Sequence, residues 1–418
     1  MNETEPCGCP DYTMTRRSLL RAAGLASAAG VVTSMTGGAL TSTVFGSTDA
    51  NVLVVLSLRG GADGLSMVVP HAEPAYHAAR PSTAIKATQV LHRDDTFGLH
   101  PAFAPLSPWW GRGELAAAHA VGLPAPNRSH FEAMEIIEDA DPGSAARIGW
   151  INRMIAGLAG PTDVMRGLQL GNTTMPTALL GPAPTLATGR LDDLTMPMHE
   201  DRRITGVLED TWRRQYGGRN DLLGRAAGDA LALAKRSATI SSAVEREPAN
   251  GATYARYSEA GAALAHGAAL IKAGVGVRAL AVDAGGWDHH AGLRWNVEDT
   301  IGKLATDLAA FFTDLGPHAS RVTLITLSEF GRRLQENGSA GVDHGYGNCV
   351  LLMGAGVRGG RYYGRWPGLG EAQQVDGDLA VTTDYRSLLG EVLAARFPEV
   401  DLSQVFPGVA RDPLGVMR

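Results

Sequence analysis

Polar side chains that can hold a metal ion recur at five places, each beside an apolar run. These places are Asp63, Ser129 with His130, Asp288 with His289 and His290, Glu329, and Asp343 with His344. Carboxylates mixed with imidazoles suit a zinc-, manganese- or iron-type ion better than calcium, which prefers oxygen ligands alone. The pattern predicts a site for one or two divalent ions, zinc or manganese, with Asp63, Asp288, His290, Glu329, Asp343 and His344 as ligands.

A serine in this set is placed to act as a nucleophile. Ser129 precedes a segment of helical spacing and is followed three residues later by Glu132, which is the capping-box pattern. Backbone N–H groups and the helix dipole stabilise an anion at such a position. A serine beside a divalent metal can attack a phosphoester, so Ser129 and His130 are candidate catalytic residues. Ser129 could equally be a helix cap and nothing more.

Several of these residues have a second interpretation. Asp63 could brace the glycine-rich turn in which it lies. Asp343 could be a ligand or could orient a neighbouring imidazole. We expect His290 to point into the site and His289 to lie behind it or on the surface, because adjacent residues project in different directions. Arg59 could clamp an anion or support its loop.

Apolar runs and helical patterns alternate along the chain. The runs cover residues 52–58, 115–121, 277–282, 322–327 and 349–353, and the helical patterns cover 101–110, 129–139, 253–273, 297–315 and 384–397. This alternation predicts an α/β fold of three layers, with a mostly parallel central sheet and helices on both faces. Ligands of such sheets bind at the carboxyl ends of the strands, so polar residues far apart in the sequence can converge there.

We expect residues 50–418 to form a single domain, in which the polar segment 200–250 is a helical insertion or cap. An apolar content of 44% and a charged content of 19% are those of an ordinary globular protein. The net charge of −6 argues against nucleic acid as a partner. Cys349 is the only cysteine after the first 49 residues, so that region can form no internal disulfide.

Residues 1–49 have the features of a twin-arginine export signal. Arg16 and Arg17 precede a mildly apolar, glycine-diluted stretch over about residues 22–40, which is too weakly apolar for a stable membrane span. We therefore expect the twin-arginine translocase as a transient partner and a periplasmic or secreted location. Because this route carries folded proteins, a metal could be loaded before export.

Six motifs in order closely resemble the bacterial family catalogued as domain of unknown function 1501. They are the leader and residues 58–65, 127–131, 285–290, 328–332 and 343–348, and the resemblance covers about residues 15–400. That family looks like a branch of the alkaline phosphatase and sulfatase superfamily. The resemblance implies an alkaline-phosphatase-like fold, with Asp63 as a bridging metal ligand, Ser129 as nucleophile and His344 as a late ligand. It also implies Asp and His ligands after the third strand.

Two departures from that superfamily narrow the expected chemistry. Glu329-Phe330 stands where the superfamily has Asp-His, so the site holds one ion, or two if Asp343 or another group is recruited. Cys349 lacks the surroundings needed for formylglycine formation, which argues against a sulfatase of that type. We expect an exported, metal-dependent hydrolase of a small phosphate or related anionic ester. The alternative is a non-catalytic exported scaffold or binding protein that keeps the fold and binds a co-secreted protein partner.

Overall fold

The computed structural model describes residues 32–33, 50–141, 143–191, 202–219, 221–234 and 236–418. Almost all of the predicted leader, residues 1–49, lies outside these ranges. Across the part of the chain that the structure describes, no helix combines the length and apolar character needed to cross a membrane.

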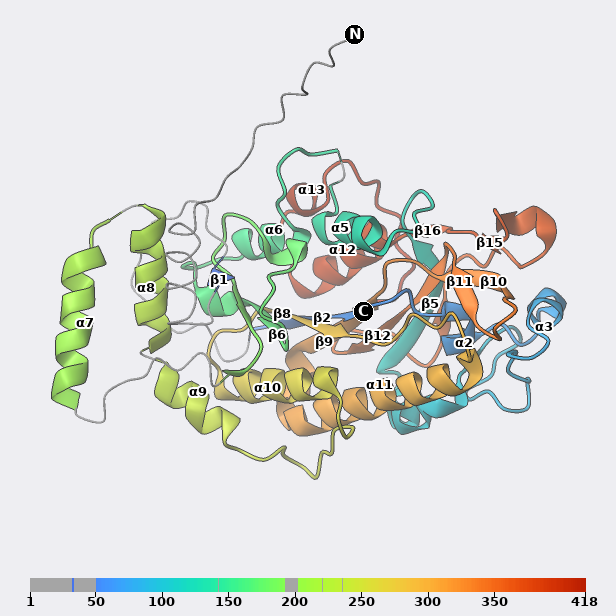
Figure 1. The fold of residues 1–418 in the computed structure, drawn as a ribbon, viewed down its shortest axis with the longest axis horizontal. Helices are drawn as coiled ribbons and strands as arrows, with labels where there is room; N and C mark the ends of the chain where they lie inside the picture. The colour runs from blue at the N-terminus through green and yellow to red at the C-terminus, as the bar shows by residue number, and fades with distance from the viewer. Residues whose placement is uncertain (1–31, 34–49, 142, 192–201, 220, 235) are drawn as a thin grey trace, which may run out of the picture.

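A large, mostly parallel sheet runs through the centre of the molecule (Figure 1). In spatial order its strands are β1 (Val32–Thr33), β7 (Leu186–Thr188), β6 (Gly167–Leu170), β8 (Ala279–Ala284), β2 (Val52–Leu58), β9 (Val322–Leu327), β12 (Asn348–Gly354), β5 (Leu115–Gly122) and β13 (Tyr362–Tyr363), and β16 (Thr383–Asp384) also pairs with β5. Strand β12 runs antiparallel to both of its neighbours, and β1 runs antiparallel to β7. The other pairs are parallel. The sheet is therefore mixed but mostly parallel, as predicted.

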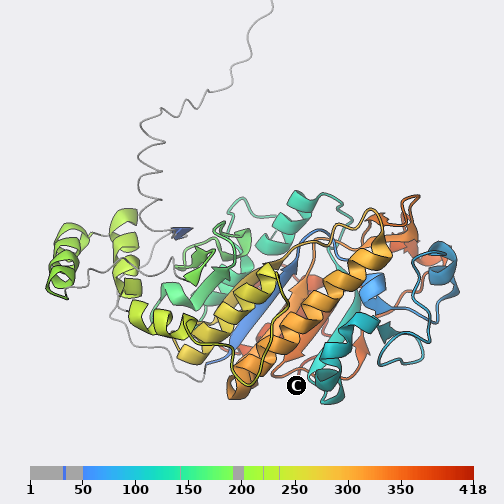
Figure 2. The same cartoon turned by 60° about the horizontal axis from the view of Figure 1, so that its bottom comes forward.

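Helices cover both faces of the sheet (Figure 1). One face carries α5 (His130–Asp139), α6 (Trp150–Ala156), α12 (Tyr385–Arg396) and α13 (Leu402–Val405), and the other carries α9 (Ser237–Val244), α10 (Glu259–Ala273) and α11 (Leu293–Leu315). Helices α10 and α11 lie side by side across their face (Figure 2). The predicted helical patterns after residue 129 correspond to α5, α10, α11 and α12, while residues 101–110 form a 3-10 helix, η1 (Pro101–Leu106), and α4 (Ser107–Gly111).

The sequence of β2 shows why two helical layers are needed. All seven residues of this apolar run are buried. Because successive strand residues point to opposite faces, Val54 and Leu56 join one hydrophobic core and Leu53 and Val55 join the other. A strand that is apolar on both sides is stable only when both faces are covered.

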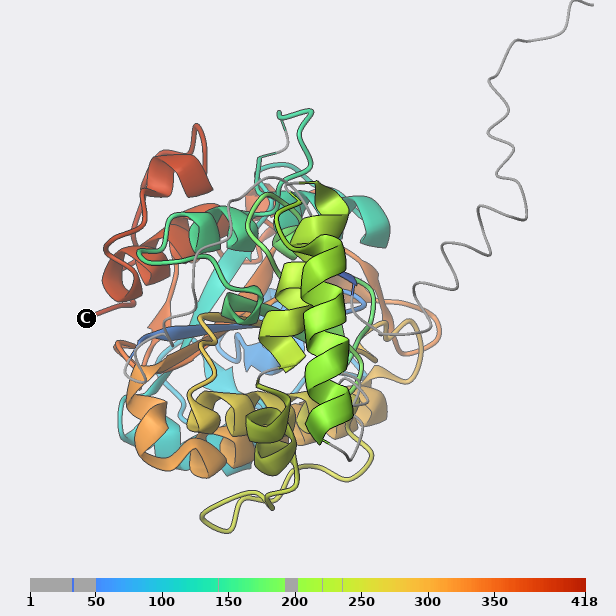
Figure 3. The same cartoon turned by 90° about the vertical axis from the view of Figure 1, so that its left-hand side faces the viewer.

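The described residues of segment 200–250 are mostly helical, as predicted. Besides α9 it contains α7 (Arg202–Tyr216) and α8 (Leu222–Ala234), which pack on each other at one end of the molecule (Figures 1 and 3). Helix α8 also contacts η2 (Val164–Arg166), the turn before β6.

Short elements connect the strands and helices of the sheet layers. They are α2 (Gly64–Met67), α3 (Pro74–Ala79), η3 (Thr177–Leu179), η5 (Gly316–Arg321), η6 (Glu371–Gln373), and the hairpins β3 (Val68–Val69) with β4 (Gly98–Leu99), β10 (Arg332–Glu336) with β11 (Val342–His344), and β14 (Gln374–Val375) with β15 (Asp378–Leu379). The β10–β11 hairpin bears directly on the site, because it carries residues 332 and 342–344.

Candidate metal centre

Strand direction brings distant parts of the chain to one edge of the sheet. Strands β2, β8 and β9 are parallel, so the loops that follow them leave from the same edge. Strand β12 runs the opposite way and begins at that edge, where Asn348 pairs with Val121 near the end of β5. The segment before β12, which contains His344, therefore meets the loops after β2, β8 and β9.

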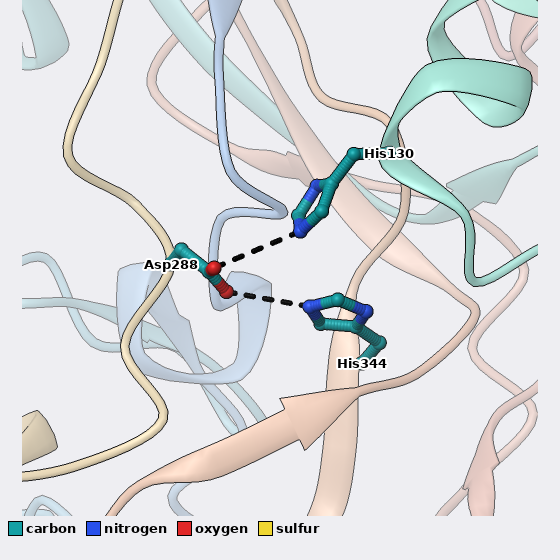
Figure 4. Close-up of side chains that lie close together, drawn as sticks. All are labelled: His130, Asp288 and His344. Carbon is teal, nitrogen blue, oxygen red and sulfur yellow. Dashed lines mark hydrogen bonds and ion pairs between the residues drawn. The ribbon is translucent and has the colours of Figure 1, made fainter.

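Asp288 lies at the centre of a cluster of three histidines. The distances from its carboxylate oxygens are 3.7 Å to His130 Nε2, 3.0 Å to His290 Nε2 and 3.3 Å to His344 Nε2. Figure 4 shows His130 approaching from the start of α5 and His344 from the end of β11, on one side of Asp288. One ligand atom from each of His130, Asp288 and His344 lies within 4.8 Å of the others, the spacing of a set that could hold a metal ion.

The far side of each imidazole faces an oxygen atom. Nδ1 lies 3.0 Å from the Arg128 carbonyl oxygen in His344, 2.7 Å from Asp343 Oδ1 in His290, and 3.5 Å from Glu329 Oε1 in His130. An Nδ1–H that points at such an acceptor leaves the Nε2 lone pair directed into the site. Histidines that bind metals almost always have this arrangement, because it fixes the ring and raises the basicity of the ligand nitrogen.

Two of these nitrogens lie unusually close together. His290 Nε2 and His344 Nε2 are 3.0 Å apart. With both Nδ1–H groups donating outward, their lone pairs face each other and repel unless a positive charge lies between them. Two imidazole nitrogens bound tetrahedrally to one zinc ion are roughly 3.3 Å apart, given Zn–N bonds of about 2.0–2.1 Å. The donor set therefore fits a divalent ion.

Arg332 supports this cluster through several hydrogen bonds. Its side chain is fully buried, and Nη2 donates to Asp288 Oδ1 at 2.5 Å while Nε donates to the Gly61 carbonyl oxygen at 2.6 Å. Nη1 donates to the Val342 carbonyl oxygen at 2.9 Å and lies 3.4 Å from His290 Nε2. One guanidinium thus joins the loop after β2, the loop after β8 and the β10–β11 hairpin.

The charge of Arg332 also sets the protonation of Asp288. Partial burial by itself would raise the pKa of the Asp288 carboxyl, but hydrogen bonds from Arg332 and His344 outweigh it and leave the pKa below its ordinary value. Burial, with help from the Arg332 charge, lowers the pKa of His344. Near neutral pH, Asp288 is therefore an anion and His344 is neutral, which are the forms that bind a metal.

Phe330 forms the apolar wall of the cluster. It is buried, and its ring centroid lies 5.0 Å from that of His130 and 4.7 Å from that of His344. The two imidazoles meet edge to face at 4.4 Å. As expected from its chemistry Phe330 offers no ligand atom, but it restricts the positions of both rings.

Glu329 lies behind His130. Its two oxygens accept hydrogen bonds from the backbone of Gly60 at 2.8 Å and of Gly61 at 2.9 Å. Gly60 has a φ of +116°, and a Cβ there would lie 2.7 Å from the Asp288 backbone nitrogen, so only glycine fits. Glu329 therefore fixes the glycine loop and faces Nδ1 of His130. Its predicted role as a direct ligand stays a prediction.

Asp63 has different neighbours from those predicted. It is buried and forms a two-pronged ion pair with Arg80, at 2.5 Å and 2.9 Å, while Ser66 Oγ donates to it at 2.5 Å. Burial would raise the pKa of the Asp63 carboxyl, but Arg80 and Ser66 hold the pKa below its ordinary value. No hydrogen bond or ion pair joins Asp63 to a histidine of the cluster. Its role as a metal ligand stays a prediction.

Ser129 caps α5, as the capping-box pattern indicated. Its hydroxyl accepts from the Glu132 backbone nitrogen at 3.5 Å, and the side chain is exposed. No hydrogen bond joins this hydroxyl to Asp288, whereas the next residue, His130, reaches the cluster. His289 is buried behind the site, with Nε2 3.4 Å from Thr300 Oγ1.

Sequence reasoning missed several supporting groups. Arg332 belongs to the motif 328–332 but was given no role, and Arg80 was not singled out. Asn337 donates to Asp343 Oδ1 at 3.0 Å and so helps to hold the carboxylate that faces His290. The Arg128 carbonyl that orients His344 belongs to the backbone, so no residue type signals it.

The stretch of chain that contains His130, Asp288 and His344 matches a protein family. Residues 98–393 match the family described as Protein of unknown function (DUF1501), which is more than half of the chain. No curated protein matches the chain. The match agrees with the resemblance carried by the six motifs, and the chain belongs to the DUF1501 family.

Proposed function

We propose that this protein is a metal-dependent hydrolase of a phosphate or related anionic ester. The observation that carries the proposal is the geometry around Asp288, in which three imidazoles present Nε2 to one carboxylate. His130, Asp288 and His344 would hold the ion, and His290 is close enough to join them.

The donor set limits the kind of ion and the number of ions. Imidazoles combined with a carboxylate suit zinc or manganese and do not suit calcium. The described residues contain one such group, so we propose one ion per chain. Both Asp63 oxygens are taken by Arg80, and Phe330 stands beside Glu329, which argues against a second ion at those positions.

When bound, the divalent ion would stabilise the negative charge that develops on the phosphoryl oxygens and on the attacking oxygen. Arg332 keeps Asp288 ionised and in place. Ser129 is exposed at the start of α5, where the helix dipole favours an anion, and is the proposed nucleophile. Its Oγ would lose its proton and form the bond to phosphorus as the bond to the departing alcohol breaks, and that alcohol would take up a proton. Water would then cleave the phosphoserine, release phosphate and restore the serine hydroxyl.

A substrate panel tests this proposal. The full chain would be assayed on aryl phosphates, phosphodiesters and sulfates with zinc, manganese or calcium. We expect hydrolysis with zinc or manganese, near-complete loss in Ser129→Ala and His344→Ala, and unchanged rates in Ser242→Ala, a change at an exposed serine on α9. Full activity in Ser129→Ala would exclude this serine as nucleophile.

The alternative is a non-catalytic exported protein that uses the same centre to bind a co-secreted partner. One observation favours it: among the described residues, the Ser129 hydroxyl makes one hydrogen bond, as the cap of α5. Bound metal together with no activity on any ester of the panel would support this alternative over the hydrolase.

We also propose export of the folded protein by the twin-arginine route, on the basis of Arg16 and Arg17. Replacing both with lysine should trap the precursor in the cytoplasm, as fractionation would show. Undiminished export of that variant would contradict the proposal.

We further propose an alkaline-phosphatase-like fold, a single domain over residues 50–418 and an insertion at residues 200–250. The order of the site residues along the chain supports these proposals.

A further inference from the structure

The orientation of His344 depends on one peptide group. Its Nδ1 lies 3.0 Å from the Arg128 carbonyl oxygen. The same peptide group includes the Ser129 N–H, which donates to Asn127 Oδ1 at 2.9 Å. Because a peptide group is planar, any rotation of it moves the carbonyl that the His344 ring faces. The contacts that hold Arg128 in place therefore also set the direction of the His344 ring.

A buried carboxylate holds the Arg128 side chain. Arg128 Nη2 donates to Asp378 Oδ2, and Asp378 lies fully buried at the start of β15. The Arg128 side chain itself is partly exposed. A second guanidinium, that of Arg333, lies 4.0 Å from Asp378 Oδ1. The Asp378 carboxylate thus ties the loop before α5 to the β14–β15 hairpin.

The pair of Arg128 and Asp378 is poorly arranged to stabilise the fold. Asp378 Oδ1 and Arg128 Nε are buried and, within the described residues, have no hydrogen-bond partner. Leaving such an atom unpaired costs about 1–3 kcal/mol. In the buried pair of Asp63 and Arg80, by contrast, both carboxylate oxygens accept from the arginine. Positioning of Arg128 therefore explains the Asp378 carboxylate better than stability does.

The hairpin that carries Asp378 also packs against the motif that carries His344. The Leu379 carbonyl oxygen accepts from the Gly347 backbone nitrogen at 2.9 Å. A Cβ on Gly347 would lie 2.6 Å from that oxygen, so the two backbones are in close contact. The hairpin thus contacts both Arg128, whose carbonyl faces the His344 ring, and the chain just after His344.

We propose that Asp378 is a positioning residue of the metal centre. It holds Arg128 so that the Arg128 carbonyl accepts from His344 Nδ1, which leaves His344 Nε2 free to bind the ion. This inference rests on the proposed function for its metal ion, and Asp378 acts on that ion only through Arg128 and His344.

Nuclear magnetic resonance of the full chain, with isotopically labelled histidine ring nitrogens, tests this role without metal. The His344 signal is the one missing from His344→Gln. In chelator-treated wild-type protein at neutral pH, we expect His344 to carry its proton on Nδ1. Asp378→Ala should increase the share of His344 that carries it on Nε2, and Asp378→Asn, which keeps an acceptor for Arg128, should lie between. Because Arg128 is partly exposed, Asp378→Ala buries no unpaired charge.

Chelator competition then measures zinc affinity in the same proteins. Asp378→Ala should bind zinc about 10–100-fold more weakly, the usual loss when support for a ligating histidine is removed. Asp314→Asn is the matched control, because Asp314 is also a buried carboxylate, paired with Lys272. It lies near the far end of α11, about 30 Å along the helix from the end next to His290. This control should lower the melting temperature but change neither the His344 proton position nor zinc affinity.

The outcomes separate this proposal from the proposed function. An unchanged His344 proton position in folded Asp378→Ala would overturn the role of Asp378, as would an unchanged affinity in protein that binds zinc. A wild-type His344 with its proton on Nε2 would also overturn it. If Asp378→Ala does not fold, wild-type behaviour of Asp378→Asn would do the same. Wild-type protein that binds no zinc, but whose His344 proton moves in Asp378→Ala, would contradict the proposed function and support the positioning role.

Discussion

Replacing Arg80 with methionine should destabilise the protein strongly. Arg80 and Asp63 are almost completely buried, and Arg80 holds both Asp63 oxygens as well as the Leu334 carbonyl oxygen. Without Arg80 the Asp63 charge would be buried with Ser66 as its remaining hydrogen-bond donor. Breaking a buried ion pair in this way costs about 3–5 kcal/mol.

This cost can be converted into a melting temperature. Unfolding entropy is about 2.1 cal/mol/K per residue, so roughly 370 residues give ~0.8 kcal/mol per degree. Arg80→Met should therefore melt about 4–6 °C lower by calorimetry at neutral pH. Asp63→Asn combined with Arg80→Met should recover part of the loss, because it removes the unpaired charge. As a control, Arg365→Met, at an exposed pair with Asp412, should change stability by less than about 1 kcal/mol.

The pH dependence has a defined sign. The pKa of Asp63 is lower in the folded state than in an unfolded chain. The contribution of the pair is therefore complete above the unfolded pKa and is lost as the pH falls through the folded pKa. The difference in stability between the wild type and Arg80→Met should shrink in strong acid. A single variant that melts within about 1 °C of the wild type, or a double variant no more stable than the single one, would refute the reasoning.

Three further changes probe the cluster by chelator competition. Asp343→Ala should lower metal affinity about 10–100-fold, because Asp343 Oδ1 accepts a hydrogen bond from His290 Nδ1 at 2.7 Å. Asp343→Asn keeps an acceptor and should lower metal affinity less. Equal losses of affinity in the two variants would indicate that Asp343 is a direct ligand. Arg332→Lys keeps the positive charge but loses the planar guanidinium that joins two loops and a hairpin, so metal affinity and melting temperature should both fall. An unchanged value of either quantity would contradict the role given to Arg332. Phe330→Leu should weaken metal binding only a few-fold, since it loosens two imidazoles without removing a ligand, and complete loss would show that the ring does more than pack.

The fold was largely predictable because its signals are local. Seven consecutive buried residues in β2 and the regular spacing along α11 can be read from short windows of sequence. The direction of β12 could not be predicted, because an apolar run does not indicate whether its strand is parallel or antiparallel to its neighbours. Helices also need not separate antiparallel neighbours in the sequence. Strands β6 and β7, of four and three residues, are too short to show a pattern.

Part of the candidate site's arrangement could be predicted, where the residue types suggest metal binding. Asp288, His290 and His344 meet, and Asp343 faces an imidazole, one of the two roles left open for it. Nothing in the sequence shows that Asp63 pairs with Arg80, because buried ion pairs depend on packing between segments rather than on spacing. The role of Arg332 could not be predicted for the same reason, because its partners come from two loops and a hairpin that are far apart in the sequence.

The orientation of His130 shows a further limit. The capping-box pattern places it beside the helix cap Ser129, and both residues are predicted to be catalytic. The structure turns its Nε2 toward Asp288, where it could act as a ligand. The direction of a side chain at the first turn of a helix depends on how the helix sits over the sheet. In this protein an ion pair between Arg59 and Glu138 links the C-terminal end of α5 to the residue that follows β2, and this contact helps to position the helix.

Metal content measured by elemental analysis tests the central claim most directly. Protein purified after its native export, without added metal, should contain about one zinc or manganese ion per chain. His344→Ala and Asp288→Asn should lose most of that metal, while Asp299→Asn, at an exposed carboxylate on α11, should keep it. Folded wild-type protein without a stoichiometric divalent ion, or with the same metal content in the His344→Ala variant, would contradict the account.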